Sequence, residues 1–187
     1  MENSIIRQKV PENLKRRLVA CVRKALHDDL PRYLMEFNPD TKNAVPRFII
    51  DQINTNIRND LACENVIIHE FKRPYGWTGK IIIDKQNCMT YNISREKRIS
   101  QIRKEKRSQP NYLQTLVSVL NKEYEAPVKQ MTLFNEGTFS FDIEILENDY
   151  DSIFCGCLAS NAGFIHCTIV YDTIQGDLSD IKILFLD

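Results

Sequence analysis

Residues 64–91 read ENVIIHEFKRPYGWTGKIIIDKQNCMTY, and this stretch decides the fold class. It holds three short runs rich in isoleucine and aromatic residues, 66–71, 80–84 and 88–91. β-Branched and aromatic residues favour strands, and the Pro, Gly, Asp and Asn between the runs favour turns. The stretch therefore predicts three strands in an antiparallel meander.

On the N-terminal side the apolar residues recur at helical spacing instead. The pattern predicts a helix over 11–35, interrupted near Pro31, and a second helix from Pro46 to about residue 61. A polar turn at 38–40 joins them, which predicts an antiparallel helical hairpin. The apolar positions are Leu14, Leu18, Val22, Leu26 and Leu30 in the first helix, and Ile49, Ile53, Ile57 and Leu61 in the second.

Two helices and four strands are expected after the meander. Ser94 can cap a very polar helix ending near Ser108, and an amphipathic helix follows residue 111. Strands are predicted over 128–134, 138–146, 164–171 and 178–186, because apolar residues alternate there. The alternation is clearest at Phe139, Phe141, Ile143 and Ile145, and the amphipathic helix presents Leu113, Leu116, Val117, Leu120 and Tyr124.

This order of elements predicts a single α+β domain over residues 1–187. We expect an N-terminal helical hairpin, a mainly antiparallel sheet of about six to seven strands, a central basic helix and one amphipathic helix. The chain has three parts: a helical part, 1–63; a basic middle part, 64–131; and an acidic, strand-rich part, 132–187.

The charges are balanced in total but segregated along the chain. The 187 residues carry 25 Lys and Arg against 25 Asp and Glu, which removes the simple argument for a polyanion-binding protein. Residues 1–63 hold 11 basic and 8 acidic side chains, and residues 64–131 hold 13 and 7. Residues 132–187 hold Lys182 alone against 10 acidic side chains. The C-terminal third is therefore strongly acidic.

The chain is expected to be cytoplasmic and without disulfides. Its N-terminus, MENSIIRQKVP, lacks the features of a secretory signal, and no apolar run is long enough to span a bilayer. A reducing compartment then favours free thiols for its cysteines, Cys21, Cys63, Cys88, Cys155, Cys157 and Cys167. The composition also resembles that of AT-rich bacterial or phage genomes.

The segment 94–108 is the most conspicuous local feature. Clustered Lys and Arg release counterions when they meet phosphates, so this segment could bind nucleic acid. Tyr75 and Trp77 in the nearby loop could stack on an unpaired base, or Trp77 could fold back over the core. The alternative is a solvated helix, or one neutralised by the acidic third of the chain. The basic residues are Arg95, Lys97, Arg98, Arg103, Lys104, Lys106 and Arg107.

A nuclease is the alternative function. Glu70 and Lys72 have the E-x-K spacing of metal-dependent nucleases, since a strand places both side chains on one face. Mg²⁺ would need a second carboxylate, and Asp84 on the next strand is the candidate. The pattern lacks an acidic residue on a preceding core strand.

The remaining motifs indicate no cofactor. Cys155-Gly156-Cys157 with His166-Cys167 offers soft ligands, but the spacing is wrong for structural zinc and favours buried thiols. His27, His69 and His166 lie in no nucleophile motif, and the chain has no dinucleotide, Walker or HExxH motif.

These observations favour a non-enzymatic binding or regulatory protein of bacterial or mobile-element type. It would contact a protein, a second copy of itself or nucleic acid through its charge-segregated surface. The nuclease is one alternative, and an inhibitor or DNA mimic that uses the acidic C-terminal face is another.

Overall fold

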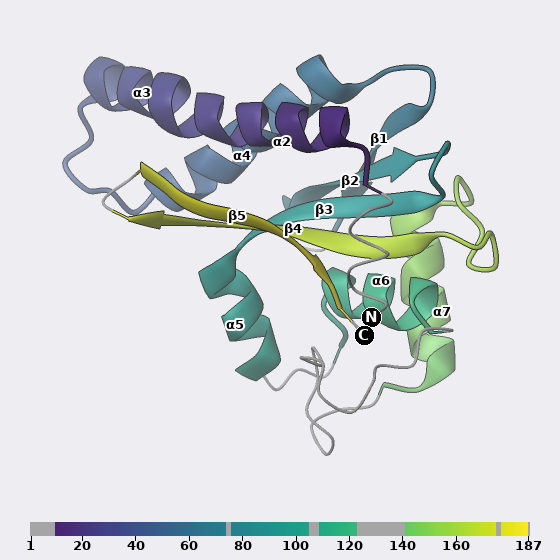
Figure 1. The fold of residues 1–187 in the computed structure, drawn as a ribbon. Helices are drawn as coiled ribbons and strands as arrows, with labels where there is room; N and C mark the ends of the chain where they lie inside the picture. The colour runs from purple at the N-terminus through teal and green to yellow at the C-terminus, as the bar shows by residue number, and fades with distance from the viewer. Residues whose placement is uncertain (1–9, 74–75, 105–108, 123–140, 175–176, 187) are drawn as a thin grey trace.

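A computed structural model describes residues 10–73, 76–104, 109–122, 141–174 and 177–186. In this part of the chain one five-stranded mixed sheet lies between two layers of helices (Figure 1). The strands follow chain order across the sheet: β1 (Val66–Lys72), β2 (Thr78–Asp84), β3 (Met89–Arg95), β4 (Ile165–Ile174) and β5 (Asp177–Phe185). One layer holds α2 (Glu12–Lys24), the π-helical η1 (Ala25–Asp29), α3 (Leu30–Phe37) and α4 (Val45–Leu61), and the other holds α5 (Glu96–Lys104), α6 (Tyr112–Leu120) and α7 (Ile143–Phe154). The α+β class is confirmed.

The predicted N-terminal hairpin is confirmed, but its first helix is not interrupted at Pro31. α2, η1 and α3 run continuously and α4 packs back along them, with the turn beginning at Asn38 in a left-handed conformation (φ 37°). Pro31 has no backbone N–H and its ring crowds the preceding turn. The widened π-helical turns of Ala25–Asp29 lie directly before it, where such a turn relieves the clash.

Three of the four strand pairings are antiparallel, but the central pairing is parallel. The meander of β1, β2 and β3 is confirmed, and β4 and β5 form the predicted closing hairpin. β3 and β4 run parallel, with Met89 beside Ile165 and Arg95 beside Tyr171. The prediction of about six to seven strands is wrong for the described residues, which contain five.

Part of one predicted strand, 138–146, is helical in the structure. Ile143 and Ile145, predicted to lie on a strand over 138–146, are in the first turn of α7. The alternation of apolar residues ends there, because Leu146, Tyr150 and Phe154 recur every fourth residue and pack against the sheet. Residues 128–134, the other predicted strand, lie outside the described residues, as does Tyr124.

The two faces of the sheet carry separate cores. Met89, Tyr91 and Ile93 of β3 face the N-terminal helices and pack with Leu18, Val22, Ile53 and Ile57. On the opposite face, Phe71, Ile81 and Ile83 pack against α6 and α7. Both faces of the central strands are therefore buried, as a parallel pair requires.

Within the described residues, no helix combines the length and apolar character needed to cross a bilayer.

Gly79 of β2 tests the packing of the second core. A Cβ at this position would lie 2.5 Å from Cζ of the buried Phe71 ring and 2.7 Å from Cη2 of Trp77. We expect Gly79→Ala to lower the free energy of unfolding by about 1–3 kcal/mol, because two packed rings must move. Thr78→Ala, at the neighbouring exposed position, is the control and should change it by less than about 0.5 kcal/mol. Urea denaturation of both variants measures this, and equal stabilities would contradict it.

Candidate functional site

The three nuclease candidates lie apart. Val66 is the partner of Asp84 across β1 and β2, whereas Glu70 is the partner of Lys80. Asp84 is therefore four residues along the sheet from Glu70, or about 13 Å. Asp84 is also buried, and it accepts hydrogen bonds from the backbone N–H of Asn87 (3.1 Å) and from its Nδ2 (2.8 Å). Its carboxylate closes the β2–β3 turn, and Glu70 and Lys72 do not share a site with it.

The aromatic loop folds back onto the core. The Trp77 side chain packs against Phe71 and Tyr112, with ring centroids 5.7 and 5.2 Å away, and 39 % of the residue stays exposed. Tyr75 lies outside the described residues. The Arg73 guanidinium forms a two-pronged ion pair with Asp149 of α7, which also accepts a hydrogen bond from Thr115 of α6. The loop is thus pinned to both helices.

The basic segment is partly neutralised by the acidic third of the chain. Arg95, in β3, donates to the Thr173 hydroxyl (2.6 Å) and lies 4.0 Å from Asp172. Lys182 pairs with Glu96 at the start of α5 (2.7 Å). Ser94 is the penultimate residue of β3 and does not begin the helix as predicted, because the strand continues to Arg95.

Two lysines of α5 still face solvent. Ile99 and Ile102 are buried and hold α5 against the sheet, while Lys97 and Lys104 are exposed. Arg98 is half-buried and interacts with the rest of the chain. The backbone of Arg103 belongs to α5, but its side chain, Lys106 and Arg107 lie outside the described set.

α7 carries the opposite charge on the same face of the sheet. Glu144, Glu147 and Asp151 are exposed, whereas Asp149 is occupied by Arg73. α5 packs against β3 and β4, α7 packs against β1, and α6 lies beside α7 (Figure 1). The exposed charges of α5 and α7 are therefore separated in space, with a basic and an acidic helix at opposite ends of one face.

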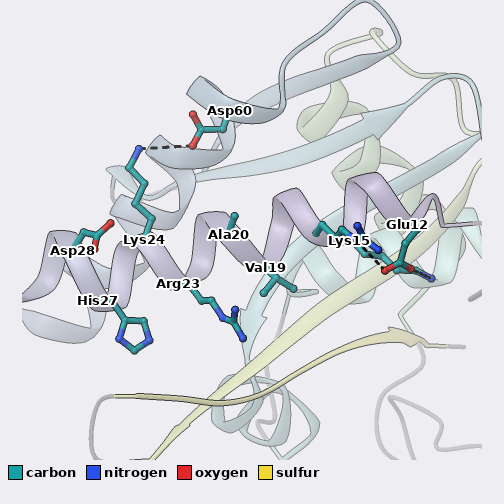
Figure 2. A pocket seen from close by; sticks show the side chains of 10 residues that line it. Glu12, Lys15, Val19, Ala20, Arg23, Lys24, His27, Asp28 and Asp60 are labelled. Carbon is teal, nitrogen blue, oxygen red and sulfur yellow. Dashed lines mark ion pairs between the residues drawn. The ribbon is translucent and has the colours of Figure 1, made fainter.

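A second charged surface covers the outer helix layer, and sequence analysis predicted only the net charge of this part of the chain. A groove follows the exposed side of α2 and η1 and reaches Asp60 of α4 (Figure 2). Lys24 points to Asp60, 3.8 Å away, while Arg23 and His27 point to the other side of the helix. His27 lies 3.7 Å from Asp177 of β5. Because its charges are mixed and mostly paired, the groove does not present a single sign.

A buried polar network joins the parallel strands. His166 of β4 is fully buried, with Nδ1 2.9 Å from the Thr90 hydroxyl and Nε2 3.0 Å from Asn92 Oδ1. Thr168 donates to the same Asn92 oxygen (2.9 Å), and Asn92 Nδ2 donates to the Tyr112 hydroxyl (3.2 Å). Burial lowers the pKa of His166 to about 3, so its imidazole is neutral at physiological pH.

At the surface, the described residues bring a thiol and an imidazole from distant segments into contact. These are Cys157 and His69. Nδ1 of His69 lies 3.4 Å from Cys157 Sγ, and Nε2 lies 2.7 Å from the carbonyl oxygen of Ile153. The imidazole stacks on Phe154, with centroids 5.5 Å apart and planes 19° from parallel. Cys157 and Cys155 are both exposed. Sequence reasoning missed this pair, because 88 residues separate its members.

The described residues contain no group of three or more His, Cys, Asp or Glu side chains placed to hold a metal ion. The zinc ligands considered in the sequence analysis do not come together for a specific reason. His166 has both ring nitrogens occupied inside the protein, and Cys167 is buried on the opposite face of β4.

A family model described as "Family of unknown function (DUF5986)" matches residues 7–187. The chain belongs to the DUF5986 family. No curated protein and no solved structure matches it. The match covers both helix layers and all five strands of this DUF5986 protein, so the surfaces described above all belong to the family domain.

His166 gives this DUF5986 protein a defined acid sensitivity. Above pH 6.5 the imidazole is neutral in both the folded and the unfolded state. Between pH 6.5 and about 3 the unfolded chain binds a proton that the folded chain does not, so stability falls as the pH falls. In urea titrations from pH 8 to 4 we expect the parent to lose up to about 1.4 kcal/mol per pH unit more than His166→Gln over that window. Parallel pH profiles for the two proteins would contradict a neutral buried histidine.

Proposed function

We propose that this chain is a non-enzymatic intracellular binding protein of bacterial or mobile-element type, whose partner is a second copy of itself. The observation that carries the proposal is the placement of exposed charge on one face of the sheet. Lys97 and Lys104 of α5 lie at one end of that face, and Glu147 and Asp151 of α7 lie at the other. Complementary charge of this kind directs association and fixes its register.

A two-fold pairing satisfies both ends at once. When two copies meet across this face in opposite directions, α5 of each lies over α7 of the other, so each contact occurs twice. Nucleic acid is a weaker partner for the same surface. Arg95 is already used within the fold, and α7 would repel phosphates.

The positions of the carboxylates favour charge-directed binding over the nuclease alternative. A magnesium-dependent nuclease needs carboxylates that converge on one ion, and the β1–β2 register holds Glu70 and Asp84 apart. Charge-directed binding needs only exposed side chains on a rigid support, and both helices are anchored by buried residues.

A charge-swap experiment tests the proposal. The basic end is reversed in Lys97→Glu/Lys104→Glu and the acidic end in Glu147→Lys/Asp151→Lys. Each double variant should weaken self-association about tenfold or more at low salt, because attraction becomes repulsion at both copies of the contact. The quadruple variant should restore it, because the charges are complementary again. Sedimentation velocity at low and moderate salt measures the dissociation constant.

Arg16→Glu/Arg23→Glu on the exposed side of α2 is the matched control for the α5 variant, with the same change in net charge on the opposite face of the sheet. It should leave association unchanged. A parent protein that stays monomeric at low salt, or a quadruple variant that fails to recover, would overturn the proposal. DNA or RNA binding that is lost in the α5 variant and not restored in the quadruple variant would instead identify nucleic acid as the partner, and inhibition or DNA mimicry would respond to the α7 variant alone.

A further inference from the structure

The hydrogen bonds of His69 define which nitrogen carries its proton. A backbone carbonyl only accepts, so the 2.7 Å contact with the Ile153 oxygen requires a hydrogen on Nε2. In the neutral ring Nδ1 then carries a lone pair, and that lone pair faces Cys157 Sγ at 3.4 Å. The thiol donates and the imidazole accepts, which is the arrangement of a nucleophile beside a base that a third group orients.

The imidazole is held in this orientation from three sides. Phe154 stacks on its face, the Ile153 carbonyl fixes Nε2, and the ring lies on β1, which is paired with β2 along its whole length. Both contacts come from the last turn of α7. Burial and the neighbouring Cys155 raise the pKa of the Cys157 thiol above its ordinary value. The sulfur therefore rests protonated, and a base must remove its proton before it can attack.

A second thiol lies two residues away. α7 ends at Cys155, whose backbone is left-handed (φ 48°), as is that of Gly156 (φ 78°). The N–H of Cys157 returns to the Phe154 carbonyl (2.9 Å) and closes a tight turn around the Cys-Gly-Cys sequence. Both sulfurs are thus carried by one exposed turn, in which Cys157 Sγ contacts the imidazole and Cys155 Sγ donates to the Ser152 carbonyl (3.4 Å).

Beyond the binding function proposed above, we propose that Cys157, His69 and Cys155 form a redox site in which thiol–disulfide exchange consumes one small disulfide per chain. The Cys157 thiol gives its proton to Nδ1 of His69, and the sulfur attacks one sulfur of the disulfide. The S–S bond breaks, and the leaving thiolate takes the proton back from the imidazolium. Cys155 then attacks the Cys157 sulfur of the mixed disulfide, the bond to the substrate sulfur breaks, and the Cys155 proton passes to the departing thiolate, which leaves as the second thiol. In total the two protein thiols are oxidised to one disulfide and the substrate is reduced to two thiols.

The aromatic disulfide DTNB, whose released thiolate is coloured, tests the proposal on the full chain. Cys63 and Cys88, the other exposed cysteines, are changed to Ser so that they do not react. We expect both aromatic thiolates to be released per chain, and mass spectrometry to find a Cys155–Cys157 disulfide with no retained adduct. His69→Gln should slow the first release about tenfold or more, because the base is lost. Added imidazole should restore part of the rate in His69→Ala, which a structural role would not produce.

Two controls keep the outcomes separate. Cys21 and Cys167 are buried, so their silence in each variant reports that the fold is intact. Cys155→Ser should stop the reaction after one release and retain the adduct on Cys157. An adduct retained with Cys155 present, two releases without Cys155, or a rate that is indifferent to His69 would each overturn the proposal. The reaction is run at moderate salt, where charge-directed self-association is weakest, because the site adjoins the charge-swap positions Glu147 and Asp151 of α7.

Discussion

The parallel pairing of β3 and β4 is the constraint on which the rest of the structure depends. Parallel neighbours cannot be joined by a short hairpin, so the chain must cross from one end of the sheet to the other. That crossover contains α5, α6 and α7, and it forms the whole second helix layer. The first layer is then required on the opposite face, because the side chains of β3 and β4 that point there are apolar. The network around His166 supplies polar contacts between the two strands, so a shift in their register would leave several buried hydrogen-bonding groups unpaired.

Local patterns predicted the elements that are governed by local physics. The four-residue spacing from Leu14 to Leu30 predicted the first helix, because one face of that helix is buried. The β-branched runs and turn residues of 66–91 predicted the β1–β3 meander. The strand prediction for Ile143 and Ile145 was wrong for a related reason. The apolar residues there fit both the two-residue period of a strand and the period of a helix, and Tyr150 and Phe154 further along the chain decide for the helix. The parallel pair was not predictable in this way. Thr90, Asn92 and His166 break the apolar pattern of their strands, and their partners lie more than 70 residues away.

The candidate sites were less predictable than the fold, since they depend on which charges meet. The sequence identified the basic segment and the acidic third as regions of opposite charge. It could not show that Arg95 and Glu96 would each find a partner from that third while Lys97 and Lys104 would stay exposed. The E-x-K motif met its spacing requirement on β1 and still failed to form a site with Asp84, because the β1–β2 register is set by the turn between them. The contact of His69 with Cys157 depends on α7, and the sequence placed a strand across its first turn.

The two internal histidines show how surroundings decide what the same side chain can do. His166 and His69 each have both ring nitrogens occupied, and each carries its proton on Nε2 toward an oxygen. At His166 every partner is buried, so an added proton would place a positive charge out of contact with solvent, and the cost of burying that charge holds the ring neutral. At His69 one partner is a thiol at the surface, and a reactant can reach it. Chemistry in this fold is therefore expected where the α7 end meets the sheet edge at β1, and rigidity where the parallel strands meet.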